Sequence, residues 1–416
     1  MLIPVPKLLL IGLATLLAGG CSWSLCQECP PCPPPAPPVA DMTLPEVVER
    51  LTPVPEKPAP PTPSALVPVS WSEVEGWQED DPALALGALL NSCTPLRLRP
   101  QWQTACAEAA TLDSRSGEAV RTFFERRFVP HRVQTPAGDV VGLVTGYYVP
   151  DLLGSRQPSP AFPCPLYRRP DDLLVIDLRE VYPELGSYRL RGRLDQQRVR
   201  PYWDRAVIDG EGRPLAGQEL CWVNDPVELF FLQIQGSGRI LFEDGSRVMV
   251  NYAEQNGHPY RSIGKWLLDR GAMSRDQMSM QNIKAWARAN PQLVGDLLSQ
   301  NPSYVFFREL PADVASPPGA LGVPLTPERS VAVDPRYTPL GAPVFLATTW
   351  PNSDRPLYRL MMAQDTGGAI RGAVRADFCW GFGKDAGSHA GSMKQRGRMW
   401  VLLPKGYPLP VNGNGG

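Results

Sequence analysis

The chain has 416 residues, of which 43% are hydrophobic and 20% are charged. This composition supports a sizeable buried core and excludes a chain that is disordered throughout. Lys and Arg total 41 against 42 Asp and Glu, and the resulting net charge of −1 excludes the broad basic field that nucleic-acid binding needs. Only three His residues are present, which leaves little for a His-rich metal site. At about 100–200 residues per domain, the length predicts two domains plus a tail.

Residues 1–20 are predicted to be a signal peptide, because one Lys precedes an apolar run that is too short and too weakly flanked to span a membrane. The run ends in LAGGC, which looks like the site at which a bacterial lipoprotein is cleaved and then lipidated on Cys21. Ordinary signal cleavage is the alternative. Ser22 follows, with no Asp to retain the protein at the inner membrane. The expected location is the periplasmic face of the outer membrane of a Gram-negative bacterium.

Residues 21–69 are predicted to be an extended tether. Fifteen prolines fall between residues 30 and 68, and such a stretch can neither form a sheet ladder nor continue a helix. Cys26, Cys29 and Cys32 stand here at a spacing that would suit half of a metal site in a cytosolic protein. Because no fourth ligand follows at ferredoxin spacing and the chain is predicted to be exported, we expect no metal there.

The folded body is predicted to begin with helices. Apolar residues recur at helical intervals over residues 81–110 and 116–128, and a further helical block is predicted over 262–298. Cys93 and Cys106 lie in the first of these regions and are expected to form a disulfide in an oxidising compartment. Short strands separated by Gly and Pro are predicted from about residue 140 to 252 and again from 301 to 404. The pattern indicates an α+β chain that is mainly β.

Two Asp residues form the first candidate site. Asp365 is followed by two glycines, which permit a tight turn, and Asp377 follows an apolar run and precedes two aromatic residues. A carboxyl beside apolar rings has a raised pKa, and a raised pKa suits a general acid near neutral pH. The alternative is that Asp365 caps a turn and that Asp377 pairs with Arg371 or Arg375.

Cys379 stands two residues after Asp377. A thiol there would serve as a nucleophile only with a base beside it, and no His lies nearby except His389. We therefore interpret Cys379 as a small core residue.

Two further candidate clusters are uncharged. Gln233 and Gln235 stand two apart in an apolar stretch, so in a strand they would share one face, and uncharged amides suit sugar hydroxyls and acetamido groups. The alternative is a structural strand with one face exposed to solvent. Tyr147 and Tyr148 follow Thr145, and a tyrosine can stack on a sugar ring and hydrogen-bond at its tip, although isolated aromatic residues are more often structural.

These motifs occur together in one known family. The sequence resembles the membrane-bound lytic murein transglycosylase A family over about residues 85–404. The resemblance rests on long motifs in the family's order, whereas one short piece such as DTGGAI would not be specific. The motifs are TGYYVP (145–150), DPVELFFLQIQGSGR (225–239), NGHPYRSIG (256–264), NPSYVFFRE (301–309), GVPLTPERSVAVDP (322–335), PLGAPVFL (339–346), AQDTGGAIRGAVRADFCWGFG (363–383) and AGSMKQRGRMWVLLP (390–404).

The resemblance implies a fold. A double-psi β-barrel domain is expected from residues 70–148, with flanking helices, together with residues 309–404. A smaller β domain, residues 149–308, is expected to be inserted between these two parts, and residues 405–416 would form a C-terminal tail. A groove for a glycan strand is expected between the two domains.

The resemblance also implies a reaction without a metal or another cofactor. Family members cut the β-1,4 bond between N-acetylmuramic acid and N-acetylglucosamine in peptidoglycan, and the muramyl C6 hydroxyl attacks C1 to leave a 1,6-anhydro ring. One Asp is thought to act as acid and then as base, and by motif position it is Asp377. Asp365 is expected to have an orienting or electrostatic role. The same mapping gives the candidate groove residues: Thr145, Tyr147, Gln233, Gln235 and Ser237.

Two other functions stay open at this point: a hydrolytic muramidase and a non-catalytic peptidoglycan-binding lipoprotein. The setting of Asp377 favours an enzyme, because a pure binder needs no acid between apolar rings. The expected partners are glycan strands and, through the lipid anchor, the outer membrane. Cell-wall synthesis proteins are further candidate partners, and nucleic acid is not one.

Overall fold

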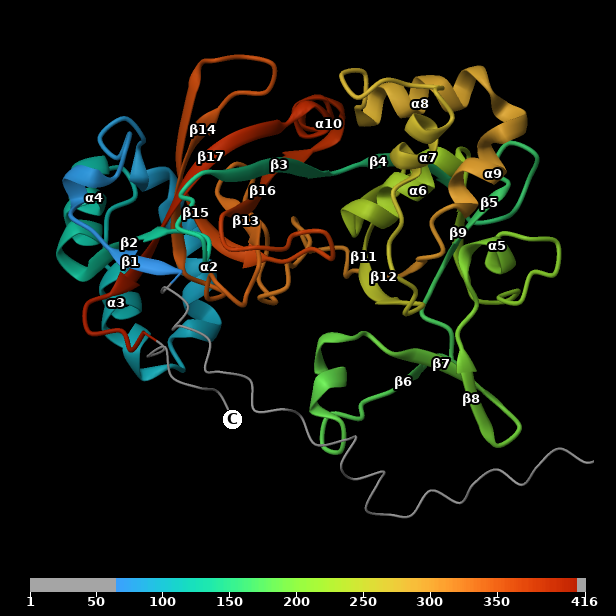
Figure 1. Ribbon diagram of the computed structural model, residues 1–416, viewed down its shortest axis with the longest axis horizontal. Helices are drawn as coiled ribbons and strands as arrows, with labels where there is room; N and C mark the ends of the chain where they lie inside the picture. Colours follow the sequence, from blue (N-terminus) through green and yellow to red (C-terminus); the bar gives the residue numbers. More distant parts are fainter. Residues whose placement is uncertain (1–64, 410–416) are drawn as a thin grey trace, which may run out of the picture. The chain divides into compact units, whose positions relative to one another are not determined.

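The computed structural model describes residues 65–409, and their strands form two main sheets and a small third one (Figure 1). The predicted signal peptide, the lipidation site Cys21, the three tether cysteines and the end of the C-terminal tail lie outside the described residues. Within residues 65–409, no helix combines the length and apolar character that a membrane span requires. The architecture is mixed α and β and mainly β, as predicted.

The first sheet contains a closed barrel. Its strands are β1 (Leu66–Pro68), β2 (Phe128–Val133), β3 (Gly142–Val149), β13 (Ser330–Val333), β14 (Pro343–Thr349), β15 (Pro356–Asp365), β16 (Arg375–Phe382) and β17 (Lys394–Pro404). Six of them pair in the ring β17-β14-β15-β13-β16-β3, and β3 pairs with β17 again. The pairs β13–β15 and β16–β3 are parallel. The predicted tether is therefore too long by several residues, because β1 already pairs with β2.

The second sheet is built entirely from residues between β3 and β13. It contains β4 (Asp151–Ser155), β5 (Cys164–Tyr167), β9 (Glu219–Val223), β10 (Ser237–Phe242), β11 (Arg247–Gln255) and β12 (Val305–Glu309). The small third sheet contains β6 (Leu174–Val175), β7 (Arg191–Asp195) and β8 (Arg198–Pro201). Only Pro150 separates β3 from β4, so one extended segment runs from the barrel into the second sheet (Figure 1).

The three regions with helical apolar periodicity are helical as predicted, but further helices lie in the stretches that were predicted to contain only short strands. The first predicted region contains η2 (Pro82–Ala85), α2 (Leu86–Leu96) and α3 (Pro100–Ala109), and α4 (Gly117–Arg127) is the second. A disulfide joins Cys93 of α2 to Cys106 of α3, as expected. The block over 262–298 contains α7 (Ile263–Asp269), α8 (Met280–Ala289), η4 (Pro291–Leu293) and α9 (Val294–Ser299). The remaining helices are η1 (Trp71–Glu73), η3 (Pro183–Ser187), α5 (Arg205–Ile208), α6 (Pro226–Gln235) and α10 (Gly383–Ser392).

The stretch that carries Gln233 and Gln235 is helix α6, so the prediction of a strand was wrong. The Asp225 side chain accepts hydrogen bonds from backbone N–H groups of the first turn, Pro226 fills the first helical position, and Gly236 ends the helix with a φ of +80°. Residues two apart in a helix point in nearly opposite directions, so the two amides share no face. A short apolar run fits both a buried strand and a buried helix, and the capping residues were the signal that separates them.

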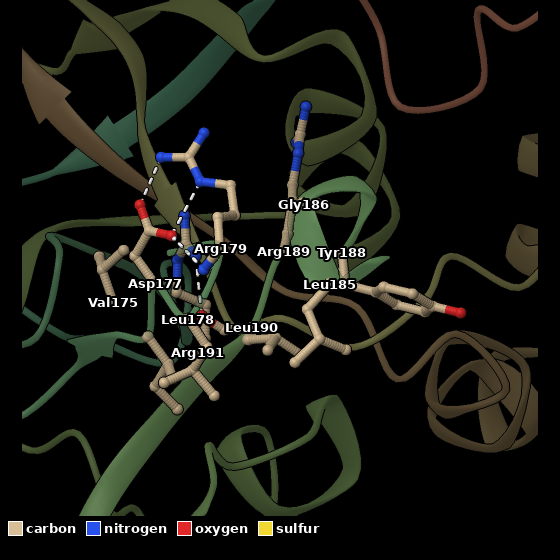
Figure 2. Close-up of a pocket in the computed structure, with 11 residues that line it drawn as sticks. Val175, Asp177, Leu178, Arg179, Leu185, Gly186, Tyr188, Arg189, Leu190 and Arg191 are labelled. Atoms are coloured by element: carbon tan, nitrogen blue, oxygen red, sulfur yellow. Dashed lines mark hydrogen bonds and ion pairs between the residues drawn. The ribbon is translucent and has the colours of Figure 1, made fainter. Parts of the chain in front are cut away.

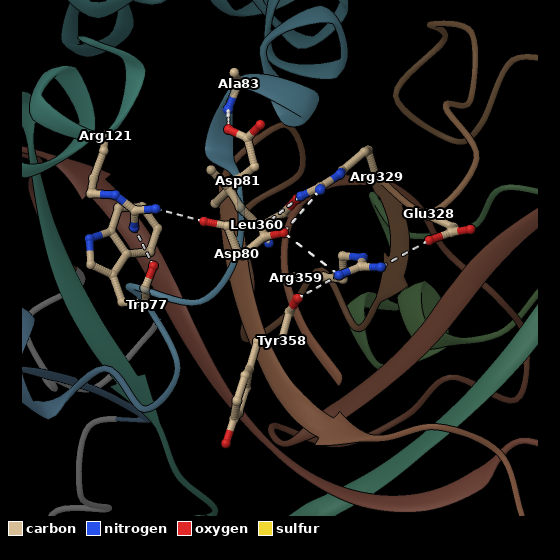
Figure 3. Close-up of polar contacts among 10 residues, drawn as sticks. All are labelled: Trp77, Asp80, Asp81, Ala83, Arg121, Glu328, Arg329, Tyr358, Arg359 and Leu360. Carbon is tan, nitrogen blue, oxygen red and sulfur yellow. Dashed lines mark hydrogen bonds and ion pairs between the residues drawn. The ribbon is translucent and has the colours of Figure 1, made fainter. Parts of the chain in front are cut away.

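A buried ion pair joins the N-terminal segment to the barrel (Figure 3). The Asp80 carboxylate accepts hydrogen bonds from two nitrogens of Arg329, at 2.6 and 3.0 Å, and from the backbone N–H of Leu360 at 2.7 Å. The side chains of Asp80 and Arg329 are only 3% and 6% exposed. Because Arg329 directly precedes β13, this pair anchors the start of that strand in the barrel.

Candidate active site

Asp377 lies on β16, and the strands on either side set its surroundings. Thr145 on β3 and Ala332 on β13 are both in register with it. Residues in register on neighbouring strands point to the same face of a sheet, whereas successive residues alternate. Ala376 and Phe378, on either side of Asp377 in sequence, pack into the main core of the barrel. The carboxyl therefore points to the face opposite that core.

The pKa of Asp377 is raised to about 6, and burial is the main cause. A hydrogen bond from Thr145 Oγ1 to Asp377 Oδ1 and the charge of Arg375 lower the pKa, while the charge of Asp365 raises it. The predicted direction of the shift and its cause, burial, are both correct, but Phe378 does not contribute to this burial, because its side chain lies on the other face of the sheet. Among the described residues, no ion pair within 4.0 Å joins Asp377 to an arginine.

Asp365 ends β15 and is also in register with Ala332, on the other side of β13 from Asp377. At about 4.8 Å per strand, the two Asp backbones are roughly 10 Å apart. Asp365 Oδ1 accepts hydrogen bonds from the backbone N–H of Ala320 at 3.0 Å and of Thr366 at 2.9 Å. Asp365 therefore does cap a turn, and it also holds the segment before β13. Burial raises its pKa, and these two donors partly oppose that rise.

Tyr147 and Cys379 form the next row on the same face, in register on β3 and β16. Both are buried in a small cluster separate from the main core. Burial raises the pKa of Cys379 to about 12, so the thiol stays protonated and is no nucleophile. Burial also raises the pKa of Tyr147 well above its ordinary value, with contributions from Cys379 and Asp365. The Tyr147 hydroxyl makes no hydrogen bond of ordinary geometry within the described residues.

The two glutamines of α6 have different settings. Gln235 Oε1 accepts a hydrogen bond from the backbone N–H of Tyr148 at 3.0 Å, so it links α6 to the strand that carries Thr145. Gln233 is buried, and its Oε1 accepts a hydrogen bond from the buried guanidinium of Arg205. Gln233 therefore lies inside the helical layer of the second sheet, and only Gln235 contacts the strand beside Asp377.

Ser237 begins β10, immediately after α6, and its side chain is buried. Asn251, in register on β11, donates a hydrogen bond to the Ser237 hydroxyl at 2.9 Å and another to the carbonyl of Pro318 at 3.3 Å. Pro318 lies in the segment that Asp365 holds. The sequence analysis did not identify Asn251, and the available signal was a single amide within the otherwise apolar run of residues 248–253.

A surface pocket lies in the region of the third sheet and shares no residue with this site (Figure 2). Its lining comes from one segment, residues 175–191. Its only acid, Asp177, accepts a hydrogen bond from Arg179 Nε at 2.8 Å, which neutralises it. The pocket therefore offers no free acid for catalysis.

Two family models match the chain. The model described as "MltA specific insert domain" matches residues 143–308, and the "3D domain" model matches residues 329–403. Membrane-bound lytic murein transglycosylase A of Escherichia coli (strain K12) is 36% identical over 265 residues, which are 62% of this chain and 64% of that protein. The counterpart in Vibrio cholerae is 34% identical over 279 residues, 65% of this chain and 68% of that protein. The match thus spans slightly less than two thirds of the Escherichia coli relative.

The matches to solved structures cover a larger share of this chain than the sequence matches to these relatives do. The lytic transglycosylase LtgG of Burkholderia pseudomallei has 48% identity and a TM-score of 0.57, covering 82% of this chain and 96% of that one. MltA of Neisseria gonorrhoeae has 39% identity and a TM-score of 0.72, covering 85% and 99%. Escherichia coli MltA with bound chitohexaose has 28% identity and a TM-score of 0.62, covering 82% and 92%.

Proposed function

The chain belongs to the membrane-bound lytic murein transglycosylase A family, and we propose that it cleaves the glycan strands of peptidoglycan as a lytic transglycosylase. The observation that carries the proposal is the environment of Asp377, a partly buried carboxyl with a pKa of about 6 that receives a hydrogen bond from Thr145. Near neutral pH such a carboxyl is protonated in a far larger fraction of molecules than an ordinary Asp, and the protonated form can release its proton to a substrate oxygen.

In the proposed reaction Asp377 starts protonated. It gives its proton to the oxygen between N-acetylmuramic acid and N-acetylglucosamine as the C1–O bond breaks. The muramyl C6 hydroxyl bonds to C1, and its proton passes to the Asp377 carboxylate. The products are a 1,6-anhydromuramyl end and a free 4-hydroxyl, and no water is consumed. One carboxyl suffices because the nucleophile belongs to the substrate itself.

The neighbours of Asp377 have supporting roles in this proposal. Thr145 donates to Oδ1, which leaves Oδ2 as the oxygen that carries the proton. Asp365 faces the same side of the sheet and supplies negative charge opposite the positive charge that develops at C1. Because Asp365 Oδ1 already accepts two backbone hydrogen bonds, it is poorly placed to activate a water molecule, which disfavours the muramidase alternative.

We assign the closed ring of six strands to a double-psi barrel formed by residues 70–148 and 309–404, with residues 149–308 as the inserted domain. The two parallel pairs in the ring and the limits of the two family matches support this assignment. The glycan would lie where the two domains meet, against Thr145, Tyr147, Gln235 and Ser237, and Gln233 would position α6 from within. Bound chitohexaose in the Escherichia coli neighbour supports a saccharide ligand.

The proposed location is the periplasmic face of the outer membrane. Residues 1–20 would be removed, Cys21 would carry lipid, and the proline-rich tether would hold the enzyme away from the anchor. The relatives in Escherichia coli and Vibrio cholerae are named as membrane-bound enzymes, which supports membrane association. Labelling cells with a fatty-acid analogue tests the anchor, because Cys21→Ala should abolish the label.

Mass spectrometry of purified sacculi digested by the full mature chain in detergent tests the function. Anhydromuramyl products, one water lighter than hydrolysed ones, should be released by the wild type and not by Asp377→Ala. Asp385→Ala is the matched control, since Asp385 is exposed on the next helix. Products with reducing ends would instead identify a muramidase. Sacculi that are bound but left intact would identify a binding protein.

A further inference from the structure

Three cationic side chains lie beside Asp377 on the same face of the barrel, and we call them the basic strip: Arg375, Lys394 and Arg396. Lys394 on β17 is in register with Thr145, which is itself in register with Asp377. Arg375 and Arg396 are both in register with Leu143, two residues before Thr145. All three cations therefore project to the side to which the acid projects.

The spacing of the strands places the basic strip within about 10 Å of Asp377, measured between backbones. Lys394 is two strands from Asp377, so their backbones are roughly 10 Å apart. Arg375 is two residues before Asp377 on the same strand, and Arg396 faces it across Leu143. Leu143 is 40% exposed, so apolar surface lies between the two guanidinium groups.

Within the described residues, none of the three cations of the basic strip forms an ion pair with a carboxylate. Lys394 and Arg396 are exposed, and neither side chain has an ion-pair or hydrogen-bond partner in residues 65–409. Among the residues that the structure describes, Arg375 donates only to backbone carbonyls, of Ala376 at 2.5 Å and Leu143 at 3.5 Å. By contrast Arg398, the next residue of β17 on this face, contacts Glu75 Oε2 at 2.6 Å. The strip is thus a local excess of positive charge in a protein whose net charge is −1.

The two sugars of the proposed substrate differ in charge. N-acetylmuramic acid carries a lactyl ether that ends in one carboxylate or continues as a peptide with several, whereas N-acetylglucosamine is neutral. The sugar whose C1 reacts at Asp377 is the muramyl one, so its lactyl group leaves the ring close to the acid. Guanidinium and ammonium groups are the usual partners of carboxylates, and exposed Leu143 can pack against the methyl groups between them.

We propose that the basic strip binds the carboxylates of the peptide stem on the muramyl residue, so that this enzyme prefers peptide-bearing glycan strands to naked ones. The inference rests on the proposed function for the identity of the substrate. It adds a binding site for an anionic peptide to a site that otherwise contacts only the glycan strand.

The test compares binding and cleavage by the full mature chain. The probes are peptide-bearing strands, the same strands after an amidase has removed the peptides, and chitohexaose, which has no carboxylate. In the Lys394→Gln/Arg396→Gln double variant, kcat/KM for peptide-bearing strands should fall about tenfold, mainly through KM, while affinity for chitohexaose stays unchanged. The preference of the wild type should also weaken as salt rises, because exposed charges are screened. Arg398→Gln is the matched control and should change none of these values.

The proposal is overturned if the double variant keeps the wild-type preference for peptide-bearing strands, or if it loses affinity for chitohexaose to the same extent. Binding by the Asp377→Asn form separates this failure from failure of the proposed function. A chain that cleaves no strand still tests the strip, because its affinity for strands with and without peptides can be measured and should differ about tenfold.

Discussion

Thr145 and Asp377 are 232 residues apart in the sequence, yet they lie in register on parallel strands and share a hydrogen bond between Thr145 Oγ1 and Asp377 Oδ1. Because this bond lowers the pKa of Asp377, Thr145→Val should raise that pKa above about 6. The descending alkaline limb of the profile of kcat/KM against pH should then move to higher pH. Thr145→Ser keeps the hydroxyl and should leave the limb in place. A limb that stays fixed in the Val variant, or moves to lower pH, contradicts the assignment of Asp377 as the acid.

Asp377→Asn should make the folded protein more stable at pH 8 while abolishing activity. The carboxyl has a pKa of about 6 in the folded state and 3.8 ordinarily, so its contribution to stability is full below pH 3.8 and is lost as the pH rises through 6. A shift of about two units corresponds to at most about 3 kcal/mol. Urea unfolding at pH 4 and pH 8 measures the difference, which should be present only at pH 8. Equal stability of variant and wild type at both pH values would show that the carboxyl is not desolvated.

Asp365 supplies a negative charge near Asp377 and also accepts two backbone hydrogen bonds, and two substitutions can separate these contributions. Asp365→Asn keeps an acceptor for the N–H groups of Ala320 and Thr366 but removes the charge that raises the pKa of Asp377. The alkaline limb of kcat/KM should therefore move to lower pH. Asp365→Ala also frees the segment before β13 and should lower kcat/KM by about a further tenfold or more. If both variants behave alike, the hydrogen bonds of Asp365 have no part in shaping the site.

The buried ion pair of Asp80 and Arg329 should contribute more to the stability of the fold than other contacts of the N-terminal segment with the barrel (Figure 3). Asp80→Ala leaves a buried guanidinium without its partner and should lower the free energy of unfolding by about 3–5 kcal/mol. The neighbouring Asp81 caps η2 through a hydrogen bond from the N–H of Ala83, and Asp81→Ala should cost only about 1 kcal/mol. Urea unfolding of the two variants measures the contrast, and equal losses would refute it.

Local signals in the sequence predicted local features well. The helices before β2 and the disulfide between Cys93 and Cys106 follow from periodicity and compartment, and both are confirmed. The strand assigned to Gln233 and Gln235 was wrong because an apolar run alone does not choose between strand and helix. The caps at Asp225 and Gly236 make that choice.

The arrangement around the acid depends on strand register, which no local pattern contains. Asp365 and Asp377 are each in register with Ala332, and Lys394 and Asp377 are each in register with Thr145. All of these pairings join segments that lie far apart in the chain. The raised pKa of Asp377 could be predicted in direction, because a carboxyl in an apolar stretch is desolvated. The sequence alone did not predict which face of the sheet Asp377 occupies or which residues share that face, because both depend on how the strands pair in the closed barrel.

The last strand of the fold completes the surroundings of the acid. Residues of β17 pair with β3, β14 and β2, so the ring cannot close until the chain is complete to about residue 404. Before closure, Asp377 is solvated and carries the ordinary carboxyl pKa, so near neutral pH it has no proton to give. If the proposed function is right, an unfinished or unfolded copy of this protein is inert toward glycan, and the proposed ability to cut arises in the same step that completes the fold.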